Sequence, residues 1–202
     1  MMNIFVINLK ERQDRKEYIV NELNYHKLSY TIVEGINGWN LDRKDYNIKK
    51  IGTKGALGCF LSHQMCLEKV TKNKAPYGII MEDDIEIITP EFMEDTKNLI
   101  KELPEDWDIC YLGSTESWKK KWSYKVAAVE PINQSCSRLK GHHYGTGAYI
   151  IRKRAIKKIK FYPIPCAIDI AFNYWGLVQY IATPNLIQQK ASWGSDTQNT
   201  IK

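Results

Sequence analysis

The segment Ile79-Ile80-Met81-Glu82-Asp83-Asp84-Ile85 decides how the rest of this sequence is interpreted. Residues 77–81 form an apolar run typical of a buried strand, and three carboxylates stand at its carboxyl end. Adjacent carboxylates repel one another, and a divalent cation offsets that repulsion because Mg²⁺ and Mn²⁺ prefer carboxylate oxygens. Alternate strand residues point the same way, so we expect Glu82 and Asp84 to face one metal ion while Asp83 points elsewhere. The alternative is an acidic turn that only solvates the end of the strand.

Strands and helices alternate along the chain around this segment. Residues 3–9 and 28–33 are expected strands, residues 53–70 an expected helix capped by Thr53, and Thr89-Pro90 the expected start of another helix. The remaining expected strands are 107–112, 145–151 and 177–181, and the remaining expected helices are 10–24, 153–160 and 168–175. This alternation predicts an α/β sandwich with a largely parallel sheet, in which ligands bind beyond the carboxyl ends of the strands.

Residues 114–144 read as irregular and rich in Trp, Lys and Ser, which suits a flexible active-site loop. The sequence shows no internal repeat, no low-complexity segment and no linker that would divide it. We therefore expect a single domain over residues 1–202.

The composition is that of an ordinary soluble protein, with 44% apolar and 26% charged residues. No stretch approaches the ~18 consecutive apolar residues of a membrane span, and the first nine residues show no secretory pattern. The five cysteines are scattered without a CxxC pair, which argues against a zinc cluster or a disulfide framework and suits a reducing compartment. The net charge of +6 favours anionic partners, although basic runs of this kind are more often solvated surface.

Several short motifs occur in a fixed order along nearly the whole chain. They are Val6-Ile7-Asn8-Leu9 with Arg12 and Arg15, Gly35, Gly55-Ala56-Leu57-Gly58-Cys59-Phe60-Leu61-Ser62-His63, Glu82-Asp83-Asp84, Trp107-Asp108-Ile109-Cys110-Tyr111-Leu112-Gly113, Gly145-Thr146-Gly147-Ala148-Tyr149-Ile150-Ile151, Ile168-Asp169 and Ser195-Asp196. Each is weak singly, but the ordered set resembles glycosyltransferase family 25, which contains bacterial lipooligosaccharide galactosyltransferases and the collagen galactosyltransferases. The resemblance implies a GT-A type fold with a Rossmann-like nucleotide-binding half. It also implies a UDP-sugar donor, often UDP-galactose, Mn²⁺ or Mg²⁺ as cofactor, and inversion at the anomeric carbon.

On this resemblance, several segments are expected to build the donor site. Backbone groups of Asn8-Leu9 would meet the uracil and ribose, and Arg12 or Arg15 would bind the base or the diphosphate. Gly35, Ser62, His63 and Asp83 complete the expected donor-binding set. The alternatives are that the arginines lie in a solvated first helical turn and that the histidine is structural. Gly55 and Gly58 are expected to let a strand or ligand approach closely, or else to be loose packing at a helix start.

The resemblance also implies a further metal ligand and a general base. Because no His follows His143, the ligand that such enzymes draw from near the C-terminus would be Asp196, a water molecule or a residue outside this chain. An inverting transfer needs one base to deprotonate the acceptor hydroxyl. The candidate is Asp169, whose apolar neighbours would desolvate it and raise its basicity, with a helix cap as the alternative role. Asp108 is a weaker candidate.

Aromatic side chains in the irregular stretch are the candidates for acceptor binding, because sugars stack their apolar faces on aromatic rings. The candidates are Trp118, Trp122 and His143, with Tyr124 and His142 beside them. Aromatic residues equally anchor loops onto a core.

Three functions from different classes compete on the sequence alone. The favoured one moves a hexose, with galactose preferred, from a UDP-sugar to a glycan acceptor such as lipooligosaccharide. The second is a catalytically silent sugar- or partner-binding module on the same fold. The third is a nucleic-acid-binding protein, which we disfavour because it has no use for the acidic triplet except as a nuclease-type metal site. We expect a cytoplasmic location, with peripheral membrane contact through Lys153, Lys157, Lys158 and Lys160.

Overall fold

The computed structural model describes residues 2–113, 128–141 and 143–197. The strands are β1 (Asn3–Leu9), β2 (Tyr30–Gly35), β3 (Tyr77–Glu82), β4 (Ile85–Ile87), β5 (Ile109–Tyr111), β6 (Ala128–Pro131), β7 (Cys136–Lys140), β8 (Ala148–Arg152), β9 (Gln179–Ala182) and β10 (Ile187–Gln189). The helices are α1 (Gln13–Tyr25), α2 (Lys54–Lys72), α3 (Phe92–Glu102), α5 (Lys153–Ile156) and α6 (Ile168–Tyr174), with 3-10 turns at Gly38–Asn40, Arg43–Asp45 and Ala191–Trp193.

One large sheet organises the molecule, with the strand order β2-β1-β3-β8-β5-β9-β7-β6, and β10 pairs separately with β4. β1 is parallel to β2 and β3, and β5 is parallel to β9. β8 is antiparallel to β3 and β5, and β7 is antiparallel to β9 and β6. Strands β2, β1, β3, β5, β9 and β6 therefore run in one direction, so the expected α/β fold with a mainly parallel sheet is confirmed.

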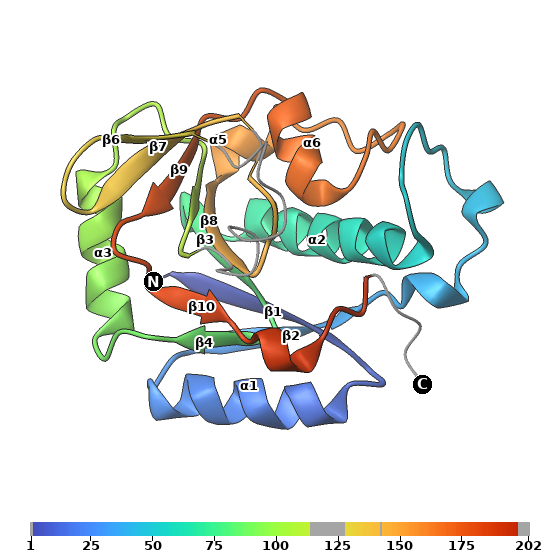
Figure 1. Ribbon diagram of the computed structural model, residues 1–202, viewed down its shortest axis with the longest axis horizontal. Coiled ribbons are helices and arrows are strands. Elements are labelled where there is room, and N and C mark those ends of the chain that lie inside the picture. The colour runs from blue at the N-terminus through green and yellow to red at the C-terminus, as the bar shows by residue number, and fades with distance from the viewer. Residues whose placement is uncertain (1, 114–127, 142, 198–202) are drawn as a thin grey trace.

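Helices cover both faces of this sheet (Figure 1). In β1, Phe5 and Ile7 belong to one core cluster, which includes residues of α2, α5 and α6. Ile4 and Val6 belong to the other, which includes residues of α1 and α3. A strand buried on both faces needs apolar residues at successive positions, which explains why the strands read as continuous apolar runs.

The start of α2 and the start of α3 differ in how well the sequence predicts them. The hydroxyl of Thr53 accepts a 3.0 Å hydrogen bond from the Ala56 amide, so Thr53 caps α2 as expected. The cap position of α3 is Glu91, and Thr89-Pro90 precedes the helix, so the expected helix start, with Thr89 as its cap, is wrong. The Thr89 hydroxyl donates instead to the carboxylate of Asp95.

Two further expectations about the C-terminal half are wrong. The stretch expected to be irregular contains the antiparallel hairpin β6–β7, which extends the large sheet. Charged residues of this hairpin, Glu130, Arg138 and Lys140, interrupt the apolar pattern that identifies the inner strands. The expected strand at residues 177–181 is confirmed as β9, and β10 follows it as a strand that the sequence did not reveal. The basic helix ends at Ile156 rather than at residue 160.

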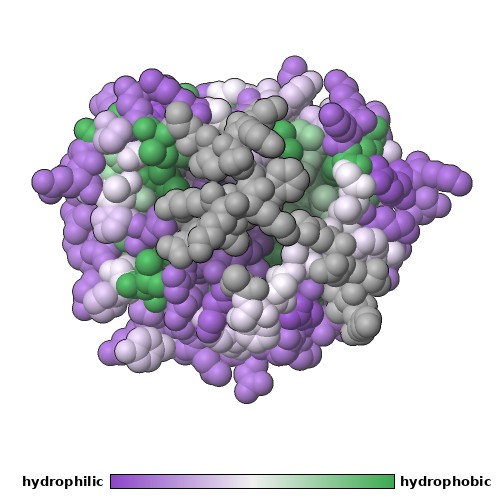
Figure 2. Space-filling view, viewed as in Figure 1, coloured by the Kyte–Doolittle hydropathy of each residue, from purple (hydrophilic) through white to green (hydrophobic). Residues whose placement is uncertain are grey.

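The described surface on the face seen in Figure 2 is mainly hydrophilic around its rim, and apolar residues reach it as separate small patches. Scattered exposed apolar residues of this kind are ordinary on a folded protein. No helix among the described residues is long and apolar enough to cross a membrane.

Candidate active site

The acidic triplet lies at the sheet edge where several chain segments meet. β1, β2 and β3 are parallel, so their carboxyl ends share one edge, and the antiparallel β8 begins there. The Glu82 amide donates a 2.7 Å hydrogen bond to the Gly147 carbonyl just before β8. Pairing of β10 with β4 brings Gln189 opposite Ile85 at the same edge. The chain thereby assembles polar groups from segments about 100 residues apart.

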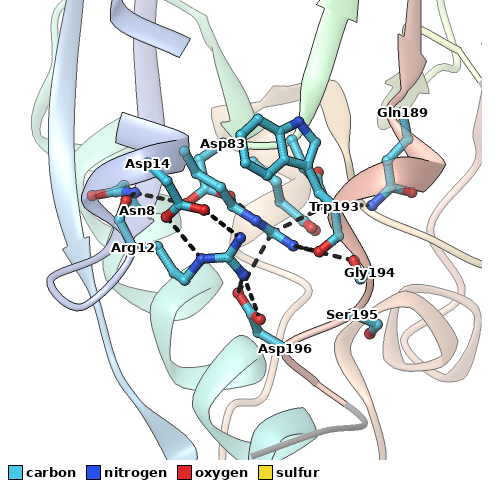
Figure 3. Close-up of polar contacts among 12 residues, drawn as sticks. Asn8, Arg12, Asp14, Asp83, Gln189, Trp193, Gly194, Ser195 and Asp196 are labelled. Atoms are coloured by element: carbon cyan, nitrogen blue, oxygen red, sulfur yellow. Dashed lines mark hydrogen bonds and ion pairs between the residues drawn. The ribbon is translucent and has the colours of Figure 1, made fainter. Parts of the chain in front are cut away.

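Arg15 is the cation at the centre of this edge, and its side chain is 5% exposed. Figure 3 labels three of the residues that it contacts, Asp83, Trp193 and Gly194. Its Nη1 lies 3.1 Å from Asp83 Oδ1 and 3.3 Å from Asp84 Oδ2. Its Nη2 donates to the carbonyls of Trp193 (3.0 Å) and Gly194 (3.1 Å). Arg15 therefore neutralises part of the triplet and fastens the C-terminal segment to it.

The three carboxylates do not point in the directions that strand alternation predicts, with Glu82 and Asp84 on one side and Asp83 on the other. β3 ends at Glu82, and Asp83 and Asp84 lie in the turn between β3 and β4, where the two-residue period no longer applies. Both turn carboxylates contact Arg15. Glu82 faces α2 instead: its Oε1 accepts a 2.6 Å hydrogen bond from Thr146 and lies 3.3 Å from His63 Nε2.

The environment shifts the pKa of each carboxyl group. Burial, reinforced by the charge of Glu82, raises the pKa of Asp84 to about 7. Burial also raises the pKa of Asp83, although hydrogen bonds from Asn8 and Arg15 oppose that rise. Burial favours the neutral form of Glu82 as well, but the hydrogen bond and charge of His63 outweigh it and the pKa of Glu82 falls. Neighbouring carboxyl groups whose pKa values are shifted in opposite directions are typical of functional sites.

The carboxylates at this edge fit a divalent cation. Asp84 Oδ2 accepts a 2.8 Å hydrogen bond from Gln189, whereas Asp84 Oδ1 is buried and receives no hydrogen bond from the described residues. A cation would satisfy that oxygen and screen the repulsion between Asp84 and Glu82. Asp196, the expected further ligand, lies with both carboxylate oxygens 2.7 Å from Arg12 Nη1, so its metal role stays a prediction.

The donor-site residues expected at the end of β1 lie beside the triplet. Asn8 is buried, and its amide donates to Asp83 Oδ2 (2.7 Å) and to the Arg12 carbonyl (3.0 Å). Leu9 is partly exposed, and Arg12 also pairs with Asp14. Asn8 therefore fixes Asp83 against the start of α1.

The two glycines of α2 allow a close approach, but of a turn and the C-terminal segment rather than of a strand or a ligand. A Cβ added at Gly55 would lie 2.5 Å from the Thr197 carbonyl oxygen, and one added at Gly58 would lie 2.4 Å from the Gly38 nitrogen and the Ile36 oxygen. The partner of Gly55 is the chain's own C-terminal segment, which is also held by hydrogen bonds from Thr53 to Thr197 and from Trp39 to Asp196. The glycines thus let this segment and the turn after β2 pack against the start of α2.

Ser62 and Gly35 lie together under the turn after β2. The Ser62 hydroxyl accepts a 2.8 Å hydrogen bond from the Ile36 amide and donates a 2.7 Å bond to the Gly58 carbonyl. A Cβ added at Gly35 would lie 3.4 Å from that hydroxyl oxygen. Ser62 is buried, so in this state it positions the turn through contacts within the protein.

Asp169 is the second residue of α6, and Ala167 occupies the cap position, so the alternative role of Asp169 as helix cap is wrong. The Asp169 carboxylate accepts hydrogen bonds from the amides of Ile170 (2.8 Å) and Gly145 (3.2 Å). Burial raises its pKa, as expected for a candidate base. The weaker candidate, Asp108, precedes β5 at the opposite edge of the sheet.

A small pocket joins the two acidic positions, because Gly145 contacts Asp169 and Gln189 contacts Asp84. Its lining residues are Gly113, His143, Tyr144, Gly145, Gly147, Ile187 and Gln189. His143 packs its ring 4.0 Å from the Tyr111 ring, and burial lowers its pKa to about 4. The other acceptor candidates, Trp118, Trp122, Tyr124 and His142, lie outside the described residues.

Sequence reasoning assigned no role to Thr146, Tyr149 or Gln189. Thr146 and Tyr149 belong to the motif of residues 145–151, which was recognised as a whole without a role for either residue. Gln189 reaches Asp84 only through the pairing of two three-residue strands, which leaves no local signal. Arg12, Arg15, His63 and Asp196 all lie at the acidic edge, and their roles in donor or metal binding stay predictions.

The fold and its acidic edge define a GT-A type glycosyltransferase architecture. The chain belongs to a family whose model is described as glycosyltransferase family 25 (LPS biosynthesis protein), which matches residues 1–171. Similar curated proteins include the human inactive glycosyltransferase 25 family member 3, 26% identical over 98% of this chain and 39% of its own length. Procollagen galactosyltransferase 2 of Mus musculus is 24% identical over 88% of this chain and 31% of its own length. Procollagen galactosyltransferase 1-A of Xenopus laevis is 27% identical over 77% of this chain and 27% of its own length.

The chain therefore spans less than two fifths of these relatives. Among solved structures, a glycosyltransferase involved in the glycosylation of the major capsid of PBCV-1 superposes with a TM-score of 0.53 at 12% identity, covering 98% of this chain and 95% of its own. A197 from STIV gives a TM-score of 0.50 at 14% identity, covering 91% of this chain and 82% of its own. At these identities the two structures show the fold alone.

Proposed function

We propose that this chain transfers a hexose, galactose in the first place, from a UDP-sugar to a glycan acceptor in a metal-assisted, inverting reaction. The observation that carries the proposal is the acidic centre at the carboxyl edge of the sheet, where Asp84 keeps one buried oxygen unpaired beside Glu82. Membership of glycosyltransferase family 25 supports the reaction class, and similarity to procollagen galactosyltransferases favours galactose as the sugar.

Glu82 and Asp84 would hold Mn²⁺ or Mg²⁺, with Asp196 or water as a further ligand. When bound, the ion neutralises the departing diphosphate. Arg12 and Arg15 both contact Asp196. Their guanidinium groups would offer pairs of hydrogen-bond donors to the diphosphate oxygens. In the structure these guanidinium groups already pair with carboxylates. Binding of the UDP-sugar would therefore replace the carboxylates by diphosphate oxygens as their partners.

Asp169 would remove the proton from the acceptor hydroxyl as that oxygen attacks the anomeric carbon and the bond to the diphosphate breaks. Two features suit it to this role: its raised pKa, and its contact with Gly145 at the wall of the pocket. His143 lines the same pocket and would contact the acceptor sugar as a neutral ring. We further propose a lipooligosaccharide acceptor and a cytoplasmic location, with peripheral membrane contact through the basic residues around α5.

The proposal is tested by UDP release from a panel of UDP-sugars, with Mn²⁺ and with chelator. We expect metal-dependent turnover of one donor, its loss in Asp84→Ala, and a loss of turnover in Asp169→Asn that Asp108→Asn does not share, with circular dichroism confirming that each variant is folded. Turnover that survives chelator or Asp84→Ala would contradict the metal role, and equal loss in both Asn variants would remove the case for Asp169.

Two observations favour a second candidate, a catalytically silent binding module on the same fold. Arg15 and Gln189 already pair with Asp84, and one similar human protein is named inactive. Metal-dependent binding of UDP without turnover of any donor, in the presence of a broad set of glycan acceptors, would support this module instead.

A further inference from the structure

A mixed set of metal-binding side chains lies on the side of Glu82 that faces α2. Cys59 and His63 are four residues apart on α2 and therefore share one face of the helix. The thiol of Cys59, a ring nitrogen of His63 and a carboxylate oxygen of Glu82 all lie within 4.8 Å of one another. One short helical turn and one strand end thus supply three convergent ligand atoms.

Each polar member of this set is held in place by a second residue. The Nδ1 atom of His63 lies 2.9 Å from the Tyr149 hydroxyl, and the two rings are stacked with an interplanar angle of 25°. The Thr146 hydroxyl donates a 2.6 Å hydrogen bond to Glu82 Oε1. A metal-binding histidine commonly uses its second ring nitrogen in this way, because the outer contact fixes the ring orientation and the tautomer.

We propose that Cys59, His63 and Glu82 form a Zn²⁺ site, in which Glu82 gives this ion one carboxylate oxygen and leaves the other for the ion at Asp84. One sulfur, one nitrogen and one oxygen ligand suit a borderline-soft ion, whereas Mg²⁺ takes oxygen ligands. Three protein ligands leave a fourth tetrahedral position for water or a substrate group. The scattered cysteines excluded only zinc clusters built from several thiols; this site needs one.

A hydrogen-bonded relay is the competing explanation of the same geometry. If the Tyr149 hydroxyl donates to His63 Nδ1, the Nε2–H of His63 can donate to Glu82, and no ion is needed. The two explanations differ in the role of Cys59, whose thiol binds the ion in the metal site and only contacts Thr146 in the relay. The thiol is therefore the residue whose behaviour separates them.

Titration of the metal-free full chain with Co²⁺ tests the site, because a thiolate bound to Co²⁺ gives a charge-transfer band in the near ultraviolet and tetrahedral coordination gives strong visible bands. We expect one Co²⁺ per chain with both features, and we expect Zn²⁺ to displace it. Cys59→Ser should lose the charge-transfer band, and Cys166→Ser, a partly buried thiol outside the cluster, should keep it. Tyr149→Phe should weaken metal affinity by about 10- to 100-fold.

Absence of the charge-transfer band from the folded wild-type chain, or its persistence unchanged in Cys59→Ser, would overturn the proposal. If Cys59→Ser does not fold, His63→Gln provides the second test, since it replaces the ring by a neutral polar amide and should also lose tight Co²⁺ binding. The inference does not rest on the proposed transferase activity. Asp84→Asn should keep the Co²⁺ bands even where it abolishes donor turnover, so failure of one proposal is distinguishable from failure of the other.

Discussion

Replacing Arg15 by Met removes the cation from the centre of the acidic edge while keeping a long side chain. Arg15 is buried and contacts Asp83, Asp84 and two carbonyl groups of the C-terminal segment. Removing one partner of a buried ion pair costs about 3–5 kcal/mol, because the remaining charge is left uncompensated. For a chain of this size, about 2–4 °C of melting temperature corresponds to 1 kcal/mol, so we expect Arg15→Met to melt about 6–20 °C below wild type.

The size of this loss should depend on pH in a defined direction. With Arg15 present, the pKa of Asp84 is about 7, well above its value in the unfolded chain. The folded state therefore binds more protons than the unfolded state between pH 4 and pH 7, and the stability contributed by Asp84 falls as pH rises through that window. At pH 5 Asp84 carries its proton and needs Arg15 less. The destabilisation by Arg15→Met should accordingly be larger at pH 8 than at pH 5.

Thermal unfolding followed by circular dichroism at pH 5 and pH 8 measures both effects. Arg43→Met is the matched control, because the Arg43 guanidinium donates to the carbonyls of Ile51 and Gly52 rather than to a carboxylate. The reasoning is refuted if Arg15→Met costs no more than Arg43→Met at pH 8, or if its cost is greater at pH 5.

Two other predictions follow from burial and packing. Burial lowers the pKa of His143 to about 4, so its stabilising contribution is complete above pH 6.5 and is lost as pH falls towards 4. In wild type, His143 should therefore account for a loss on the order of 3 kcal/mol in the free energy of unfolding between pH 6.5 and pH 4. His143→Phe should not show this part of the loss in urea unfolding, and an unchanged dependence on pH would contradict the prediction. Gly58→Ala places a methyl group 2.4 Å from backbone atoms of Ile36 and Gly38, and should lower the free energy of unfolding by about 1–3 kcal/mol. Gly52→Ala, where nothing lies within 4 Å, should change it by less than about 0.5 kcal/mol, and equal losses would show that the close approach does not matter.

The sequence predicted best those features that local pattern determines. The buried strands β1 and β3 are apolar on both faces, so their positions and the carboxylates at the end of β3 were visible without the structure. The β6–β7 hairpin was missed because its charged residues interrupt the apolar run. Thr89-Pro90 has the composition of a helix start, yet α3 begins two residues after Pro90.

Long-range pairing accounts for the rest of what the sequence did not predict. The triplet was recognised, but not which carboxylate contacts which residue. Asp83 and Asp84 contact Arg15 and Glu82 contacts His63, because a turn starts after Glu82 and because α1 and α2 supply these partners. The hydrogen bond from Gln189 to Asp84 crosses 105 residues. No local pattern in either segment carries that information.

Calorimetric binding of UDP in the presence of Mn²⁺ or chelator tests the central claim, that the acidic edge holds a metal ion and a nucleotide together. We expect UDP to bind the wild-type chain with Mn²⁺ at least ~10-fold more tightly than with chelator, which corresponds to about 1.4 kcal/mol. Asp84→Asn should lose this metal dependence, and Asp45→Asn, an exposed carboxyl in the 3-10 turn Arg43–Asp45, should retain it. UDP binding that is equally tight with chelator, or equally metal-dependent in Asp84→Asn, would contradict the account.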